Sequence, residues 1–320
     1  MKIVYFGSGE FGIDCLNALA GSSHSLQFIV TQPSQPAGRG RKPKPTPVAI
    51  WAQDHSIPFI ETDNVNAPQS IEKIAAHKPD LIVVIAFGQK IGNQLIKLPT
   101  KGVINVHASL LPKYRGAAPI SWAIIKGEKE TGISIITLAE KMDAGDILAQ
   151  TKTTIEPDET AGQLHDRLAT MAAPLLIETI EKLVDNSVVY TEQDHSKATL
   201  APKLKKTDGF LDFTESAESL KRKILGFWPW PSASAVYISK KTGKHIRVTL
   251  AKAELVGIKN LGGLPPGAVD ENLSVICGRG ALKILKIKPE GSRLMDFKDF
   301  VNGWQCRPGD SFIRTETIGF

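Results

Sequence analysis

An uninterrupted apolar run, Leu81-Ile-Val-Val-Ile-Ala86, restricts the possible folds of this 320-residue chain more than any other segment. A strand that is apolar at every position has both of its faces buried, which is typical of a central strand in a parallel sheet. The run is too short to cross a membrane, because a spanning helix needs about 20 apolar residues. It therefore predicts an open α/β sheet with helices on both faces, and no membrane partner.

The segments around this run alternate between strand-like and helix-like patterns, as βαβ units do. Pro47 and Pro68 are expected to begin helices, because proline fits the first helical turn, with Thr46 and Asn66 as their caps. The expected strands are 2–6, 27–31, 81–86, 102–107, 132–138 and 146–152, and a long amphipathic helix covers 161–183. These elements predict a Rossmann-like domain over residues 1–190.

The remainder of the chain has a different pattern. Residues 191–206 are polar and lack periodicity, so we expect a linker there. Short strand-like runs then follow a single helix and are separated by turns rich in glycine and proline, which is typical of a small barrel. The expected helix is 217–225, and the expected strands are 235–238, 246–253, 274–277 and 282–287. We therefore predict a smaller, β-rich, OB-like domain over residues 207–320.

The net charge of +6 is unevenly distributed between these parts. Residues 203–320 hold 20 Lys and Arg against 12 Asp and Glu, whereas residues 1–202 hold 19 against 21. A basic second domain favours a polyanionic partner such as nucleic acid. A lysine-rich, solvated surface explains the charge equally well. A further alternative is a protein that only binds RNA and has no enzyme activity.

The motif Gly7-Ser-Gly9-Glu-Phe-Gly12 after the first strand matches the glycine pattern of dinucleotide-binding folds. Such a site also needs an acidic residue at the end of the second strand, where this chain has Thr31-Gln32. Glu10 within the turn would repel a pyrophosphate. We therefore interpret the glycines as a tight strand-to-helix turn and expect no nicotinamide cofactor, with an NAD-linked oxidoreductase as the alternative.

The segment Asn105-Val-His107 ends a predicted strand. Side chains alternate across a strand, so Asn105 and His107 point to the same side at its carboxyl end, where open α/β sheets bind ligands. An amide donor beside an imidazole suits an oxyanion that develops on a carbonyl group. Asp143, in the turn between two later strands, is the acid we expect to orient His107 or accept its proton. The alternative is a structural histidine and a solvated acidic turn.

The cysteines and histidines do not indicate a metal centre. Cys15, Cys277 and Cys306 are far apart and lack a C-x-x-C spacing, and the histidines are scattered. We expect reduced structural thiols and no metal. The chain starts directly with a strand pattern, so we expect a cytoplasmic protein without a signal peptide.

Four short segments together closely resemble the folate-dependent formyltransferases: Asn105-Val-His107, Ser109-Leu-Leu-Pro112, Arg115-Gly116 and Met142-Asp143-Ala-Gly145. The resemblance implies that Asn105, His107 and Asp143 are catalytic and that 10-formyltetrahydrofolate is the co-substrate. It also implies folate contacts, at Ser109, Leu110, Leu111, Pro112 and the loop Phe87-Gly88-Gln89.

The resemblance extends over the whole chain only for the family members that combine this domain with a linker and an OB-like domain. Those members imply methionyl initiator tRNA as the acceptor, and hence a bacterial cytoplasm; we expect a monomer. A basic insertion at residues 35–45 is expected to be an exposed loop that contacts tRNA through Arg39, Arg41, Lys42 and Lys44. Alternatives within the family are another folate-dependent formyltransferase or a 10-formyltetrahydrofolate hydrolase.

Overall fold

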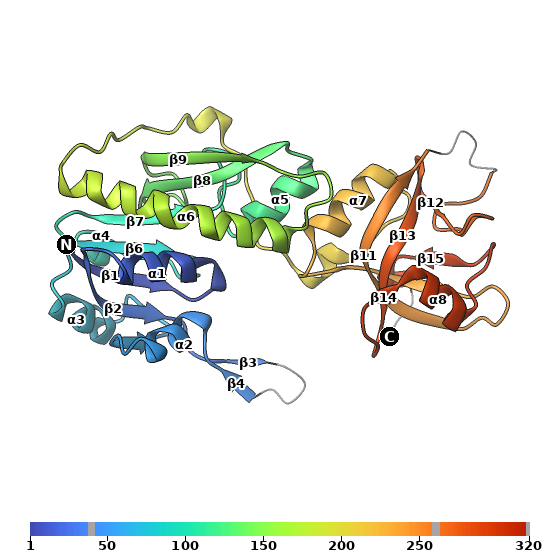
Figure 1. Cartoon of the computed structure of the whole chain (residues 1–320), viewed down its shortest axis with the longest axis horizontal. Coiled ribbons are helices and arrows are strands. Elements are labelled where there is room, and N and C mark those ends of the chain that lie inside the picture. Colours follow the sequence, from blue (N-terminus) through green and yellow to red (C-terminus); the bar gives the residue numbers. More distant parts are fainter. Residues whose placement is uncertain (38–41, 258–262, 318–320) are drawn as a thin grey trace. The chain divides into compact units, whose positions relative to one another are not determined.

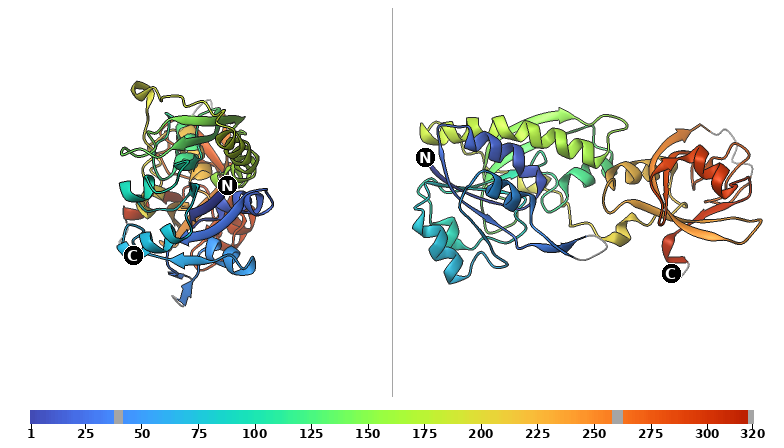
Figure 2. Two further views of the ribbon diagram at one scale, coloured as in Figure 1. Left: turned by 90° about the vertical axis from the view of Figure 1, so that its left-hand side faces the viewer. Right: turned by 60° about the horizontal axis from the view of Figure 1, so that its bottom comes forward.

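The computed structural model describes residues 1–37, 42–257 and 263–317, and its chain forms two compact units (Figures 1 and 2). Unit 1 consists of Met1–Pro119, Glu130–Thr154 and His165–Pro202, and unit 2 of Ile120–Lys129, Ile155–Leu164 and Lys203–Phe320. None of the described helices is long and apolar enough to cross a membrane.

A seven-stranded sheet forms the centre of unit 1, with the order β5-β2-β1-β6-β7-β8-β9. Its first five strands are parallel, and β8 and β9 are antiparallel to their neighbours. The apolar run forms the central strand at 81–85, which is buried at every position as predicted, whereas Ala86, the last residue of the predicted strand, lies beyond it and is exposed. The strands are β1 (Lys2–Gly7), β2 (Ser25–Thr31), β5 (Phe59–Glu61), β6 (Leu81–Ile85), β7 (Val103–His107), β8 (Glu130–Thr137) and β9 (Ile147–Thr154).

Helices cover this sheet, and α1 and α6 lie side by side, where Thr170 donates a hydrogen bond to Asp14 (Figure 1). The predicted start of α2 is confirmed, because Thr46 accepts a hydrogen bond from the Ala49 backbone. The cap predicted for α3 is wrong: its N-cap is Ala67, one residue later than Asn66. The helices of the unit are α1 (Ile13–Ala20), α2 (Pro47–Asp54), α3 (Pro68–Ala76), α4 (Asn93–Ile96) and most of α6 (Ala161–Val184).

The glycines of the first turn make room for a buried tyrosine. Gly7 and Gly12 have no left-handed backbone angle, but a Cβ at either position would overlap the Tyr5 side chain. Tyr5 is fully buried. Close packing, more than an unusual turn conformation, therefore explains why these two positions are glycine.

The basic insertion is not simply a loop, which corrects the expectation from its prolines. β3 (Gln35–Ala37) and β4 (Lys42–Lys44) pair as an antiparallel ribbon, with Pro36 opposite Pro43. Antiparallel pairs alternate between hydrogen-bonded and non-hydrogen-bonded positions, so two prolines, which lack an N–H, are tolerated when they face each other at a non-hydrogen-bonded position.

Unit 2 contains an antiparallel, nearly closed barrel-like sheet with the order β12-β13-β11-β10-β15, and this confirms the predicted barrel. The helix α7 (Ala217–Gly226) was predicted, but α8 (Phe297–Trp304) and the strands β14 and β15 were not. Phe227 is buried, whereas the nearby Trp230 is 56% exposed. The strands are β10 (Ala233–Ile238), β11 (His245–Val256), β12 (Val275–Ile276), β13 (Ala281–Pro289), β14 (Met295–Asp296) and β15 (Ser311–Ile313).

Candidate active site

Strand β7 carries two of the predicted site residues at its carboxyl end. Asn105 pairs with Ile136 of β8 and His107 with Ser134, so both side chains lie on the same side of the sheet. His107 is buried, whereas Asn105 is half-buried. Within the described ranges, no group forms a hydrogen bond with the Asn105 side chain. Its amide is therefore available to a bound molecule.

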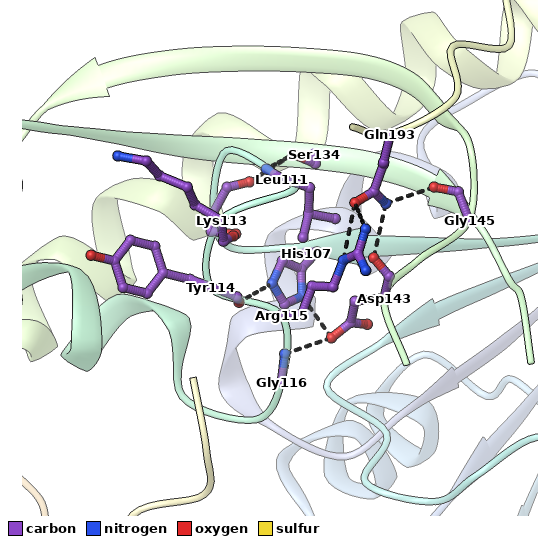
Figure 3. A network of polar contacts seen from close by, with 11 residues as sticks. His107, Leu111, Lys113, Tyr114, Arg115, Gly116, Ser134, Asp143, Gly145 and Gln193 are labelled. Carbon is purple, nitrogen blue, oxygen red and sulfur yellow. Dashed lines mark hydrogen bonds and ion pairs between the residues drawn. The ribbon is translucent and has the colours of Figure 1, made fainter. Parts of the chain in front are cut away.

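His107 is held between a backbone carbonyl and a carboxylate (Figure 3). Its Nε2 lies 2.9 Å from the Tyr114 carbonyl oxygen, and its Nδ1 lies 3.7 Å from Asp143 Oδ2. A carbonyl oxygen only accepts hydrogen bonds, so Nε2 carries a proton. The second nitrogen, Nδ1, is then the atom at which the ring gains or loses a proton, and it faces Asp143.

Asp143 lies in the turn between β8 and β9 with a left-handed φ of 52°. Its Oδ2 accepts a hydrogen bond of 2.8 Å from the Gly116 backbone. Gly145 permits a close approach in this turn, because a Cβ there would overlap the Thr137 carbonyl. The Asp143 side chain is 16% exposed, so the carboxylate contacts His107 and remains accessible.

The structure also reveals residues that sequence reasoning missed. Gln193, in the predicted linker, is buried and donates hydrogen bonds to the carbonyls of Asp143 and Gly145. Its oxygen accepts from Arg115, whose guanidinium also contacts His195 Nδ1 at 2.9 Å. A single glutamine in a polar, aperiodic stretch carries no signal by which the sequence alone could identify it.

The predicted folate-contacting turn follows directly after His107. Ser109 donates to the Lys113 carbonyl, and Ser134 connects the turn to β8 by accepting from the Leu111 amide and donating to the Ser109 carbonyl. The turn is thus fixed from within the protein. Leu111 is buried, and Leu110 and Pro112 are half-buried.

The second predicted folate-contacting loop, Phe87-Gly88-Gln89, follows β6 at the same edge of the sheet. The Phe87 ring is buried against Phe6, and its carbonyl accepts a hydrogen bond from Gln32. Gly88 has a φ of 78°, which favours glycine. The Gln89 amide is used internally, with the Thr62 carbonyl and the Val65 amide as partners. Side chains at positions 87 and 89 are therefore occupied, and the backbone is what this loop can offer a ligand.

Of the residues predicted to contact tRNA, Arg39 and Arg41 lie outside the described residues. Lys42 and Lys44 lie in β4, and Lys44 is exposed. The ribbon of β3 and β4 follows the carboxyl end of β2, which is the same edge of the parallel sheet where β7 ends at His107.

The three cysteines are buried, free thiols. Burial raises the pKa of Cys15 and Cys277 to about 12 and that of Cys306 to about 11. These thiols stay protonated at neutral pH and are poor nucleophiles. Across the part of the chain that the structure describes, no three His, Cys, Asp or Glu side chains are grouped to hold a metal ion.

Comparison with known proteins identifies the family to which this chain belongs. Residues 1–180 match the family model "Formyl transferase", and residues 203–305 match "Formyl transferase, C-terminal domain". The chain belongs to the formyl transferase family. It is 39% identical to the methionyl-tRNA formyltransferase of Citrifermentans bemidjiense over 97% of this chain and 95% of that protein.

Two solved structures share the fold at low sequence identity. The sugar 3N-formyl transferase WlaRD, solved in the presence of dTDP and 5-N-formyl-THF, has a TM-score of 0.64 at 15% identity. The match covers 92% of this chain and 99% of the WlaRD chain. HypX from Aquifex aeolicus in complex with tetrahydrofolic acid has a TM-score of 0.59 at 18% identity, and the match covers 95% of this chain and 47% of HypX.

Proposed function

We propose that this protein transfers the formyl group of 10-formyltetrahydrofolate to the α-amino group of methionyl initiator tRNA. The observation that supports the chemistry is the 3.7 Å pair of His107 and Asp143 beside the side-chain amide of Asn105, to which no described residue forms a hydrogen bond. The acceptor is inferred from the 39% identity, over nearly the full length of both chains, to a methionyl-tRNA formyltransferase.

The reaction needs a hydrogen-bond donor to stabilise an oxyanion and a group that accepts the proton lost by the attacking amine. Asn105 donates a hydrogen bond from its amide to the formyl oxygen. This oxygen becomes negative when the acceptor amine adds to the formyl carbon. His107, protonated at Nδ1, adds positive charge beside that oxygen. Asp143 stabilises the charged ring and accepts the proton that the amine loses. Breaking the bond between the carbon and the folate nitrogen returns the carbonyl, and a proton from this pair completes the leaving group.

The substrates are assigned to different parts of the chain. The folate is held beside His107 by the turn at Ser109–Pro112 and the backbone of the loop at 87–89. The tRNA is bound through its phosphates by Arg39, Arg41, Lys42 and Lys44 of the basic insertion at residues 35–45, and by unit 2. We further propose that the protein acts as a monomer in the bacterial cytoplasm, where formyl-methionine starts translation.

The decisive experiment incubates the protein with 10-formyltetrahydrofolate and methionyl initiator tRNA and measures formylmethionine on the tRNA. A parallel reaction without tRNA measures free formate. Formylation that depends on tRNA supports the proposal. Formate release at the same rate with and without tRNA would instead indicate a hydrolase.

Salt is expected to weaken the use of tRNA and to leave the folate nearly unaffected. Raising monovalent salt from about 50 to about 200 mM should increase the KM for tRNA at least about tenfold, the change expected when two phosphates are neutralised. The KM for 10-formyltetrahydrofolate should change less than about twofold, since its binding relies on the buried turn. Steady-state kinetics with each substrate varied in turn measures both values. Equal sensitivity of the two would contradict this division.

Arg39→Ala is expected to lower kcat/KM for tRNA about tenfold, because one phosphate contact is lost. The KM for folate should be unchanged. Lys73→Ala on α3 is the matched control, since Lys73 is an exposed basic residue outside the basic insertion. An unchanged kcat/KM for Arg39→Ala would remove this residue from the tRNA-binding set.

A further inference from the structure

Gln193 is a buried amide with all of its hydrogen-bonding capacity in use (Figure 3). It is 4% exposed. Its Nε2 donates to the Asp143 carbonyl at 2.8 Å and the Gly145 carbonyl at 2.7 Å, and its Oε1 accepts from Arg115 Nε at 3.2 Å and Nη2 at 2.7 Å. A side-chain amide has two donor hydrogens and two acceptor lone pairs, so no further bond is available for a ligand. The residue therefore acts within the protein.

The two carbonyls bound by Gln193 belong to the turn that presents the Asp143 carboxylate. Asp143 adopts a left-handed backbone conformation, which is unfavourable for residues that carry a Cβ. Such a conformation persists only where the surroundings hold it in place. Gln193 supplies that restraint on both sides of the turn, at residues 143 and 145.

The same segment of chain holds the other partner of His107. The Arg115 amide donates to the Thr199 carbonyl at 2.8 Å, and the Ala201 amide donates to the Arg115 carbonyl at 2.7 Å. The Tyr114 amide donates a hydrogen bond to Thr199 Oγ1, while the Tyr114 carbonyl accepts one from His107 Nε2. Residues 193–201 thus connect the Tyr114 and Asp143 sides of the imidazole, and Gln193 and Arg115 join them through side chains.

We propose that Gln193 is a positioning residue for formyl transfer, which sets the distance between Asp143 and Nδ1 of His107 by holding the turn at 143–145. The inference rests on the proposed function, because it assumes that the pair moves a proton during transfer. It assigns a kinetic role to a glutamine outside the sequence motifs of the site. Loss of Gln193 is therefore expected to lower kcat and to leave KM nearly unchanged, since Gln193 has no hydrogen bond left for either substrate.

Two variants separate the donor bonds of Gln193 to the turn from its acceptor bonds to Arg115. Gln193→Ala removes all four hydrogen bonds. Gln193→Glu keeps the size and the two acceptor bonds to Arg115, but it replaces the donors with an oxygen that faces two carbonyl oxygens. Both variants are expected to lower kcat about 100-fold, the cost of a misplaced catalytic group, with KM for both substrates changed less than about threefold. Gln163→Ala, which removes an exposed amide of α6, should keep the wild-type kcat.

A double-mutant cycle distinguishes positioning of Asp143 from a general structural role. In an Asp143→Asn background, Gln193→Glu should reduce kcat less than about threefold further, because the group it positions is already altered. A full additional 100-fold loss would overturn the inference, as would a wild-type kcat for Gln193→Glu or a change confined to KM. If Gln193→Ala folds poorly, the near-isosteric Gln193→Glu decides. Wild-type activity of Asp143→Asn itself would refute the role of the His107–Asp143 pair on which this inference rests, whereas an unaltered protein that does not formylate the tRNA would refute the proposed function. An impaired Asp143→Asn with a fully active Gln193→Glu would refute this inference alone.

Discussion

Replacing His107 with alanine is expected to reduce kcat for formyl transfer by at least about 1000-fold, because the variant loses charge stabilisation and proton transfer together. The structure gives the physical reason: Nδ1 faces Asp143, and Nε2 is fixed by the Tyr114 carbonyl. No other side chain is expected to replace both contacts. Single-turnover formylation of methionyl initiator tRNA at saturating folate measures the chemical step directly.

The tRNA affinity of His107→Ala should stay within about twofold of the wild-type value, since phosphate contacts provide most of that affinity. His77→Ala is the matched control. His77 caps α3 and stacks on Phe28, and it precedes β6 at the amino end of the strand, opposite the edge where His107 lies. Its kcat should be unchanged. More than about a tenth of the wild-type rate in His107→Ala would remove His107 from the mechanism.

The parallel sheet was predictable because its signals are local. The run at Leu81–Ile85 reports burial on both faces by its composition alone, and the cap at Thr46 depends on a residue three positions away. Asn105 and His107 could be placed at the carboxyl end of β7 for the same reason, since strand alternation needs no knowledge of the rest of the chain. The class of fold and the edge that carries the site therefore follow from short segments.

The supports of the site were not predictable because they join distant segments. Gln193 binds the backbone at Asp143 and Gly145, about 50 residues earlier in the chain, through hydrogen bonds that no periodicity reports. The ribbon of β3 and β4 could not be predicted because prolines disfavour strands in general, whereas here Pro36 and Pro43 pair with each other. The glycine pattern predicts a tight turn, but Gly7 and Gly12 make space for a tyrosine ring. In each case the deciding contact comes from tertiary structure.

Asp310 is a buried carboxylate that joins three parts of unit 2. It is fully buried and accepts hydrogen bonds from Tyr237 Oη at 2.5 Å, the Lys240 amide at 2.8 Å and the Arg307 amide at 2.9 Å. Burial, with the hydrogen bond to Asp310 as the second cause, raises the pKa of Tyr237 above its usual range. The phenol therefore stays protonated and donates at every physiological pH. The bonds tie β10 and the turn after it to the loop between α8 and β15.

Asp310→Ala is accordingly expected to lower the free energy of unfolding of unit 2 by about 3 kcal/mol, because buried donors are left without an acceptor. Against a typical total of about 5–15 kcal/mol, this is a large loss. Urea unfolding followed by tryptophan fluorescence, to which Trp304 stacked on Phe300 contributes, measures it.

Tyr237→Phe removes one of the three bonds to Asp310 and should cost about 1 kcal/mol. The exposed Asp299→Ala on α8 should change stability by less than about 1 kcal/mol, because it loses only a favourable contact with the helix dipole. A loss of stability in Asp310→Ala no greater than that of Asp299→Ala would mean that water satisfies the three donors. The carboxylate would then not hold the elements of unit 2 together.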